Sequence, residues 1–561
     1  MNALDVTSRG LAQQALQLGP KLARPQGAFS IGRQRSEPEA LLEPIKDILD
    51  RIDLSPQSFG ALCTGETSDE EAFWWFNQAI SMAGEGIVRL DPKTYTFGLE
   101  NPDEGFRWKW SNGGLIGRGV DRTILRNIHP QGMRSLELFE SCENVYFADL
   151  TFDGRMLCWG ANSLRNVIFH RCRFTTAPTQ AMNAVQIVTD NMAEGVRFVY
   201  FIDCEFVDAG RMNLELQNHT NDGVIRYANI YLIRPRIIGA GKVDAVNGFG
   251  LSFSGKGERV VIDRPYFDGN SATQLENAGC DRMVVRDAEV RASTLPVGQR
   301  PIVFSAVDAT YDSNENCVID GFTLVRAAGD MIGARPAMSS TLYFEASRNL
   351  VLRRIVAAID NTDPSSSEAS VIFITSAGPD SNGTPRTSVN ATIEDCDLWS
   401  NAPGKSLIEF IDAQGVQYVT RNQLHNDSAD RFGALVAANA YPDAQAFTVR
   451  LANNRMSAAR PHSQTSFLTR SGPGGFTVED NNDGLPVRFR QTVTVPAGAT
   501  QSAPTAHGLP AETPRLLARS LGPTFGAGAC WTTAQDGYLI ANFTSAPSAD
   551  VSVEVEAEAA Y

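Results

Sequence analysis

A nine-residue pattern that recurs about a dozen times restricts the fold of this chain more than any other feature. Each copy has apolar residues at positions 2, 4, 7 and 9 and polar residues elsewhere. Clear copies begin at Asn144 (NVYFADLTF), Asn166 (NVIFHRCRF) and Phe198 (FVYFIDCEF), and weak ones extend to GFTVEDNND at Gly475. Successive copies start about 30 residues apart, a period typical of chains that stack one supersecondary unit on the next.

The parity of the apolar positions changes within each copy. Positions 2 and 4 point one way, as in a strand, and the shift to positions 7 and 9 predicts two short strands that meet at a corner. Short alternations between copies, such as MNLELQN from Met212, predict a further side of the coil. Helical periodicity between strands, which a (β/α)8 barrel requires, is missing from residues 144–483. The sequence therefore predicts an all-β solenoid of about 12 coils over residues 58–484.

Two positions of the repeat predict ladders of like side chains. Position 7 faces inward, and its cysteines are expected to be inert core thiols while its last asparagines are expected to form an amide ladder. These residues are Cys172, Cys204, Cys396, Asn422, Asn454 and Asn481. Position 8 faces outward, where Arg173, Glu205 and Arg236 predict a surface charge ladder.

The segments outside the repeat have other patterns. Ser68 and Glu71 form a capping box, and the helix that they begin is expected to cap the first coil. Residues 1–57 are expected to form a separate helical segment. Within its predicted helix, over residues 37–53, four apolar residues recur at coiled-coil-like spacing: Leu41, Ile45, Ile48 and Ile52. Residues 485–561 predict a small antiparallel β-sandwich-like domain.

Composition excludes several classes of function. With 49 Lys and Arg against 64 Asp and Glu, the net charge of −15 repels polyanions, so no nucleic acid partner is expected. The sequence has no long apolar run and no signal-peptide pattern at its start, which predicts folding in a cytoplasm without membrane insertion. The nine cysteines and six histidines show no metal-ligand spacing, so neither a metal nor another cofactor is expected.

One pair of carboxylates has a spacing that suits glycoside hydrolysis. Glu215 and Glu276 occupy the same position in coils that are two apart, which separates them by about 9.6 Å. This lies at the upper edge of the range for inverting glycosidases, in which one carboxyl group is the acid and the other the base. Asp268 and Asp244 are substitutes. The alternative is that all four are solvated surface carboxylates, and His219 beside Glu215 is the one local candidate for the base of a lyase.

Outward aromatic residues suggest surfaces on which sugars could stack. Trp399 and His425 share one position on adjacent coils, and Trp159 is a further candidate. The alternative for each is that the ring covers a loop against the coil.

The residues around the first coil resemble a known family. Phe59, Gly60 and Ala61, the capping helix, and the strand from Ile116 to Leu125 are similar to motifs of bacteriophage tailspikes, which are pectate-lyase-like right-handed parallel β-helices. The usual G-D-G is replaced by Thr64, Gly65 and Glu66. The resemblance implies a homotrimeric virion spike, folded in the host cytoplasm, whose N-terminal segment docks on other virion proteins. It also implies binding of a host surface polysaccharide, either capsule or lipopolysaccharide.

Three functions remain open at this point. The first is a tailspike that binds, and as a depolymerase also cuts, its polysaccharide by hydrolysis or by lyase chemistry. The second is a non-catalytic structural adhesin or fibre of the particle. The third is a secreted bacterial polysaccharide lyase, which predicts a signal peptide. Fold alone does not choose among them, because members of the family include lyases, hydrolases and silent adhesins.

Overall fold

A computed structural model describes residues 55–558 apart from short internal segments, and it divides them between two compact units. The segments outside the description, besides 1–54 and 559–561, are 65–66, 84–85, 99–104, 130–133, 139–140, 159–162, 177–179, 191, 221, 297, 306–313, 326–335, 361–369, 380–385, 402–405, 427–433, 442–443, 459–467, 479–481, 484–487, 507–514, 521–529 and 536–537. Of the described residues, the first unit contains those within 55–336, 343–351 and 377–386, and the second contains those within 337–342, 352–376 and 387–558.

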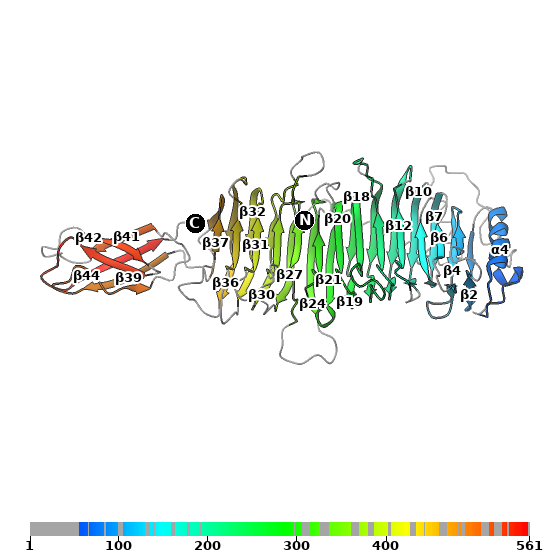
Figure 1. Cartoon of the computed structure of the whole chain (residues 1–561), viewed down its shortest axis with the longest axis horizontal. Coiled ribbons are helices and arrows are strands. Elements are labelled where there is room, and N and C mark those ends of the chain that lie inside the picture. The colour runs from blue at the N-terminus through cyan, green and yellow to red at the C-terminus, as the bar shows by residue number, and fades with distance from the viewer. Residues whose placement is uncertain are drawn as a thin grey trace, which may run out of the picture. The chain divides into compact units, whose positions relative to one another are not determined.

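The first unit begins with a short 3-10 helix, η1 (Pro56–Phe59), and the helix α4 (Glu70–Ala83), which lies beside the first coil (Figure 1). Phe73 on α4 packs against Tyr95, Phe97 and Phe106, with ring centroids 4.9–5.2 Å apart. The carboxylate of Asp69, just before α4, accepts hydrogen bonds from the backbone N–H groups of the first coil and of the preceding loop. The helix therefore covers the apolar end of the first coil.

Three parallel ladders of strands form the rest of the first unit. The first ladder is β1 (Gly86–Arg89), β4 (Gly113–Ile116), β7 (Ser141–Ala148), β10 (Ser163–His170), β13 (Gly195–Ile202), β16 (Tyr227–Ile233), the second half of β18 (Leu251–Asp263), β21 (Val284–Arg291) and β24 (Val318–Val325). The second is β2 (Thr94–Phe97), β5 (Ile124–Asn127), β8 (Thr151–Asp153), β11 (Arg173–Thr175), β14 (Glu205–Val207), β17 (Arg236–Ile238) and β19 (Tyr266–Asp268). The third is β3 (Phe106–Trp108), β6 (Arg134–Leu138), β9 (Arg155–Cys158), β12 (Val185–Val188), β15 (Leu214–Gln217), the first half of β18, β20 (Leu275–Asp281), β22 (Ile302–Phe304) and β25 (Leu342–Glu345).

The second unit continues the same architecture and ends in a small β-domain. Its ladders contain β27 (Val351–Ile359), β28 (Ile372–Thr375), β29 (Thr392–Glu394), β30 (Asp397–Ser400), β31 (Ile408–Ile411), β32 (Gly415–Thr420), β33 (Gln423–Asn426), β34 (Val436–Asn439), β35 (Phe447–Ala452), β36 (Arg455–Ala458), β37 (Leu468–Ser471) and β38 (Gly474–Val478). Two antiparallel three-stranded sheets follow, β39 (Arg488–Val495), β44 (Val551–Glu558) and β41 (Arg515–Ser520) in one, and β40 (Thr505–Ala506), β43 (Tyr538–Phe543) and β42 (Cys530–Gln535) in the other. Valine, leucine and phenylalanine side chains from strands of both sheets form one buried cluster.

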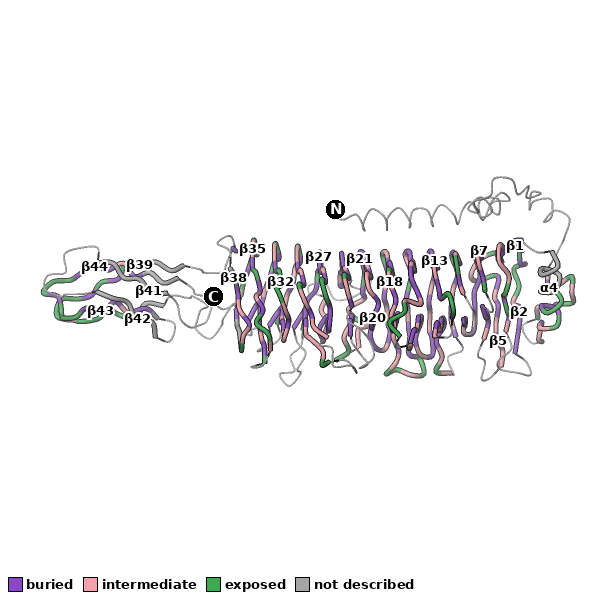
Figure 2. Tube along the Cα trace, turned by 90° about the horizontal axis from the view of Figure 1, so that it is seen from above, coloured by how far each residue is buried: buried purple, intermediate pink, exposed green. Residues whose placement is uncertain are grey.

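The predicted β-helix and C-terminal antiparallel domain are confirmed. The number of coils differs slightly from the expected twelve. Short connections β23 (Asn314–Glu315), β26 (Ser347–Arg348) and η2 (Ala292–Thr294) complete the described elements. Buried residues recur throughout the coils (Figure 2).

The corner inside each repeat copy results from the backbone conformation of single residues. Residues at positions 1 and 6 have positive φ, for example Asn144 at 56°, Asp149 at 55°, Asn166 at 54° and Arg171 at 49°. A single left-handed residue turns the strand and reverses which side chains face inward, and asparagine and aspartate tolerate this conformation best. The recurring Asn at position 1 is therefore explained by the turn that it makes.

Inward side chains form stacked rows. The rings of Phe147, Phe169 and Phe201 stack on successive coils with centroids 5.1 Å apart. Cys172 and Cys204 are fully buried, and burial raises the pKa of the Cys204 thiol. The structure describes eight cysteines, all with free thiols and all buried except the half-buried Cys63, as expected of inert core residues.

The amide ladder forms in the second unit, but its last member is one residue later than predicted. Asn422 Nδ2 donates to Asn454 Oδ1 at 3.0 Å, and Asn454 Nδ2 donates to Asn482 Oδ1 at 2.8 Å. Asn481, the predicted member, lies outside the described residues. The apolar pattern of the last copy is weak, so counting from its start misplaces the inward residue by one position.

The outward charge ladder is confirmed. Arg173 Nε lies 2.8 Å from Glu205 Oε2, and Arg236 Nε lies 3.7 Å from Glu205 Oε1. All three side chains are at least a quarter exposed, so each pair contributes about 1 kcal/mol or less.

Candidate functional site

Four polar residues lie in register along the third ladder of the first unit. Gln186 on β12 pairs with Glu215 on β15, which pairs with Ser252 on β18, which pairs with Glu276 on β20. The two glutamates are thus two rungs apart in one row, a Cα separation of about 9.6 Å at ordinary strand spacing. Their flanking residues Leu214, Leu216, Leu275 and Asn277 are buried inward, so this polar row faces out.

Glu215 is held by donors on three sides. Its Oε2 accepts hydrogen bonds from Asn183 Nδ2 at 2.6 Å and Gln186 Nε2 at 2.9 Å. Arg211 Nη1 lies 3.7 Å from the same oxygen. With these neighbours, Glu215 is only 6% exposed. Two amide donors and one guanidinium suit a carboxylate that carries its negative charge.

Glu276 has different surroundings. Burial raises its pKa above the ordinary value, and the negative charge of Glu215 raises it further. The hydroxyl of Ser252, which donates to Glu276 Oε2 at 2.6 Å, and the positive charge of Arg211 oppose this shift without cancelling it. The same row therefore contains one carboxyl group that amide and guanidinium donors surround and one whose pKa is raised by burial.

Arg211 links this row to a third carboxylate. Its Nε lies 4.0 Å from Asp244 Oδ2, on the connection that follows β17. The Asn247 side chain donates to Asp244 Oδ2 at 2.9 Å, and this hydrogen bond is the largest cause that lowers the pKa of Asp244. Asp244 is half-buried and contacts Arg211, so it lies beside the pair. We name Arg211, Glu215, Asp244 and Glu276 the carboxylate cluster.

The structure does not bring Asp268 or His219 into contact with the pair. Asp268 lies at the end of β19, in the second ladder, where Arg291 Nη1 donates to its Oδ2 at 3.0 Å. The ring of His219 contacts Gln217 at 2.7 Å, and its backbone N–H donates to Asp190. Asp268 fails to join because the corner after β19 turns the chain before the third ladder begins.

Two of the aromatic candidates, Trp399 and His425, lie against each other in the second unit. Trp399 on β30 and His425 on β33 are paired in register, and their rings stack at 3.9 Å between centroids with a 25° tilt. Asp397 accepts a hydrogen bond from Trp399 Nε1 at 2.6 Å, and His425 Nδ1 contacts Ser457 Oγ at 2.5 Å. These polar contacts fix both ring planes. Trp159, the other aromatic candidate, lies outside the described residues.

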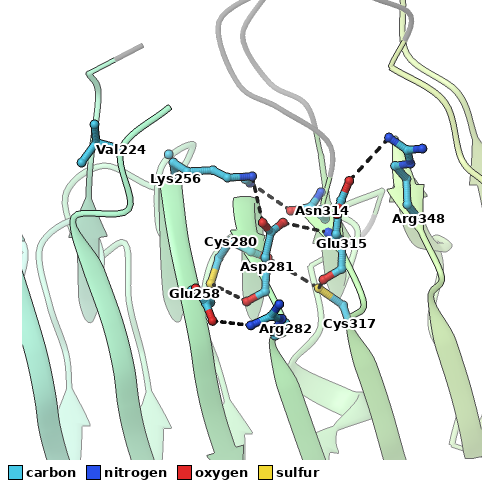
Figure 3. Close-up of polar contacts among 12 residues, drawn as sticks. Val224, Lys256, Glu258, Cys280, Asp281, Arg282, Asn314, Glu315, Cys317 and Arg348 are labelled. Atoms are coloured by element: carbon cyan, nitrogen blue, oxygen red, sulfur yellow. Dashed lines mark hydrogen bonds and ion pairs between the residues drawn. The ribbon is translucent and has the colours of Figure 1, made fainter. Parts of the chain in front are cut away.

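A second group of carboxylates was not predicted from the sequence (Figure 3). Asp281 lies 2.8 Å from Lys256 Nζ and accepts a hydrogen bond from the Glu315 N–H at 2.9 Å. Glu258, in register with Asp281 on the neighbouring strand, lies 2.6 Å from Arg282. Burial raises the pKa of Asp281. Because each of these carboxylates has a cation partner from a neighbouring coil, we interpret the group as ion pairs that fix the coils to one another.

The donors around the two glutamates, Gln186 for Glu215 and Ser252 for Glu276, could have been found from the register of the repeat. Gln186 and Ser252 share the row with Glu215, and Arg211 precedes Glu215 by four residues. Asn183 gives no such signal, because it lies in a connection whose path the repeat does not determine.

Membrane-spanning helices and metal-ligand clusters can be considered for the described residues. None of the helices there is both long and apolar enough to cross a bilayer. Across those same residues, no three His, Cys, Asp or Glu side chains are grouped as metal ligands.

Comparisons with known proteins give likenesses in fold. No protein-family model matches the chain, and no curated protein matches it. A tailspike protein variant of E. coli bacteriophage HK620, in complex with a pentasaccharide, is 12% identical with a TM-score of 0.49, covering 97% of this chain and 100% of that one. PfbA, a surface adhesin of Streptococcus pneumoniae, is 12% identical with a TM-score of 0.42, covering 87% and 98%. The Agl-KA catalytic domain is 13% identical with a TM-score of 0.41, covering 76% and 68%. The strand pairings of the chain itself define the fold as a parallel β-helix.

Proposed function

We propose that this chain binds a polysaccharide of a bacterial surface, capsule or lipopolysaccharide, along the third ladder of its first unit and hydrolyses it. The observation that carries the proposal is the placement of Glu215 and Glu276 two rungs apart on one outward row, in different surroundings. A glycosidase needs two carboxyl groups that differ in protonation state.

The separation of the pair favours inversion. Retaining enzymes place their carboxyl groups about 5 to 5.5 Å apart, whereas inverting enzymes leave about 6.5 to 9.5 Å so that a water molecule fits beside the sugar. The Cα atoms are about 9.6 Å apart, and side-chain rotation can bring the two carboxyl groups closer together than that, into this range. Neighbouring rungs, at about 4.8 Å, would suit the retaining geometry instead.

The surroundings assign one role to each carboxyl group. Glu276, protonated, donates its proton to the glycosidic oxygen as the bond to the anomeric carbon breaks. Glu215, ionised, takes a proton from a water molecule that attacks the same carbon from the opposite face. Each turnover leaves Glu276 ionised and Glu215 protonated, and exchange with solvent restores both. Arg211 positions Glu215 and Asp244 relative to each other.

Two other parts of the chain have roles in the proposed function. The stacked rings of Trp399 and His425 form a separate sugar-binding surface on the second unit. By the sequence resemblance to tailspikes, the chain is a homotrimeric appendage of a phage or phage-like particle, attached to other virion proteins through residues 1–57.

A non-catalytic adhesin is the second candidate, and the burial of Glu215 favours it. A side chain that is 6% exposed meets water only when Arg211 moves aside. In that case Glu215 serves as an anchor for its amide and guanidinium neighbours, and the row binds glycan without cutting it.

The experiment incubates the protein with a panel of purified capsules and lipopolysaccharides and follows reducing ends together with absorbance near 235 nm. We expect reducing ends without absorbance, lost in Glu276→Gln and in Glu215→Gln. Asp268→Asn is the matched control, because Asp268 is a carboxylate in another ladder, and it should retain activity. Absorbance at 235 nm would establish a lyase, and binding without release would establish the adhesin.

A further inference from the structure

The first ladder of the first unit has an apolar row on its outer face. Tyr146, Ile168, Tyr200, Tyr231 and Val261 occupy position 3 of successive repeat copies and pair in register. The residues that follow Tyr146, Ile168 and Tyr200 are the phenylalanines stacked in the core, so the row itself points outward. The repeat pattern predicts a polar residue at position 3, and that prediction is wrong for these coils.

A second apolar row runs beside the first. It contains Ile116, Ala148, Ile202 and Ile233, with His170 between Ala148 and Ile202, and it ends at the charged residues Arg89 and Asp263 on the outer rungs. The two rows belong to one cluster of buried residues, which also includes Ile87 on the first rung. We name these two rows the outer stripe.

The outer stripe is covered. Tyr146, Ile168, Tyr200, Tyr231 and Val261 are each 0–6% exposed. Rings of neighbouring rungs stack, as Tyr200 and Tyr231 do at 4.9 Å, but stacking hides only the flanks of an outward side chain. Among the described elements, the main packing partners of β10, β13 and β16 are the adjacent strands of the same ladder. Something beyond these strands therefore covers the stripe.

We propose that residues 37–53 of the same chain bind along the outer stripe as an amphipathic helix. The described chain begins at Ser55, next to η1 and α4 at the first coil, where the stripe also begins with Ile87. Four apolar residues of the segment repeat at helical spacing: Leu41, Ile45, Ile48 and Ile52.

The dimensions of the two partners agree. Seven rungs from Ile87 to Val261 span about 29 Å at 4.8 Å per interval. A helix of seventeen residues, with a kink expected at Pro44, is about 26 Å long at 1.5 Å per residue. A helix along the axis of the coils therefore covers nearly the whole stripe.

The charges of the two partners also agree. Residues 37–53 contain six acidic and two basic residues. Beside the stripe, Arg165 and Arg197 lie in register on β10 and β13, and Arg197 donates hydrogen bonds only to backbone carbonyl groups among its described contacts. Arg165 is exposed. An acidic helix over the stripe places negative charge next to both guanidinium groups.

The proposal changes what residues 1–57 do. Residues 37–53 become part of the β-helix surface, and attachment to a particle is left to the residues before them. The outer stripe then resembles the inner face of a domain that is closed by its own N-terminal helix, and it is not a surface for a second copy.

The first test places the photo-crosslinker p-benzoylphenylalanine at position 48 of the full chain. After illumination, we expect the crosslinked product to migrate as a single chain, with mass spectrometry locating the link in peptides that contain Tyr200 or Tyr231. The same peptides in a crosslinked dimer would show that a second copy covers the stripe and would overturn the proposal. Links to other parts of the chain would overturn it as well.

The second test measures nitration of Tyr200 and Tyr231 by tetranitromethane in the full chain. Ile45→Asp combined with Ile48→Asp should accelerate nitration of both tyrosines at least tenfold, because the helix leaves the stripe. Ala40→Asp, on the other side of the predicted helix, is the matched control and should leave the rate unchanged. Equal rates in the double variant and the wild type would contradict the proposal.

Discussion

His170 provides the sharpest test of the outer stripe as a buried surface. It is 6% exposed, its Nδ1 contacts the Tyr146 hydroxyl at 2.9 Å, and its Nε2 contacts Arg171 at 3.2 Å. Burial, and then the positive charge of Arg171, lowers the pKa of His170 from 6.5 to about 4, although Asp203 and Asp149 oppose the shift. The folded protein therefore holds this histidine neutral.

The sign and size of the effect follow from the two pKa values. An unfolded histidine binds its proton near pH 6.5, and the folded one only near pH 4, so stability is full above pH 6.5 and falls as the pH drops toward 4. At 1.36 kcal/mol per pKa unit, about 2 kcal/mol is lost between pH 7.5 and pH 5.0. The complete loss, below pH 4, is about 3 kcal/mol.

Urea denaturation of the wild type and of His170→Gln at both pH values measures this loss. Glutamine can still bond to Tyr146 but does not titrate, so the variant should lose about 2 kcal/mol less than the wild type between pH 7.5 and pH 5.0. His219→Gln is the control, because His219 is exposed, and it should follow the wild type. The reasoning is refuted if wild type and His170→Gln lose the same free energy of unfolding over this interval.

Three further predictions concern the ladder and the two candidate surfaces. Asn454→Ala removes a buried amide that both donates and accepts in the asparagine ladder, so the free energy of unfolding should fall by about 2–4 kcal/mol, measured by urea denaturation, with Gln423→Ala at an exposed position of β33 as control. Hydrolysis should decline as the pH rises through the raised pKa of Glu276, because the acid must be protonated, and the pH profile of kcat/KM should show this limb at a higher pH than for an ordinary glutamate. Trp399→Ala should weaken glycan binding about tenfold in calorimetry without changing the circular dichroism spectrum, and unchanged affinity would exclude the stacked rings as a sugar surface.

The repeat was sufficient to predict the β-helix, because its apolar positions depend on which side chains face the core. It also placed Glu215 and Glu276 on one row, since residues at the same position of successive coils must share a row when the register holds. Asn481 shows the limit of this reasoning. In a weak copy the core residue can shift by one, and Asn482 joins the ladder instead.

What the repeat could not predict lies in connections and on outer faces. Asp268 was a substitute for one of the two glutamates, yet a corner of the coil places it in another ladder, with Arg291 as its partner. Tyr200 and Tyr231 lie at position 3, where the repeat pattern predicts polar residues. An outward row of apolar side chains is buried only when another part of the protein covers it. A segment that covers the coil is held there by tertiary packing, and the periodicity of the repeat does not predict where it binds.

The anomeric configuration of the first product tests the central claim most directly. Proton NMR during cleavage of a susceptible polysaccharide would show the new reducing end before mutarotation. The account predicts inversion relative to the glycosidic bond that is cut, because Glu215 and Glu276 are two rungs apart. A product that retains the configuration, or that carries a double bond, would contradict it.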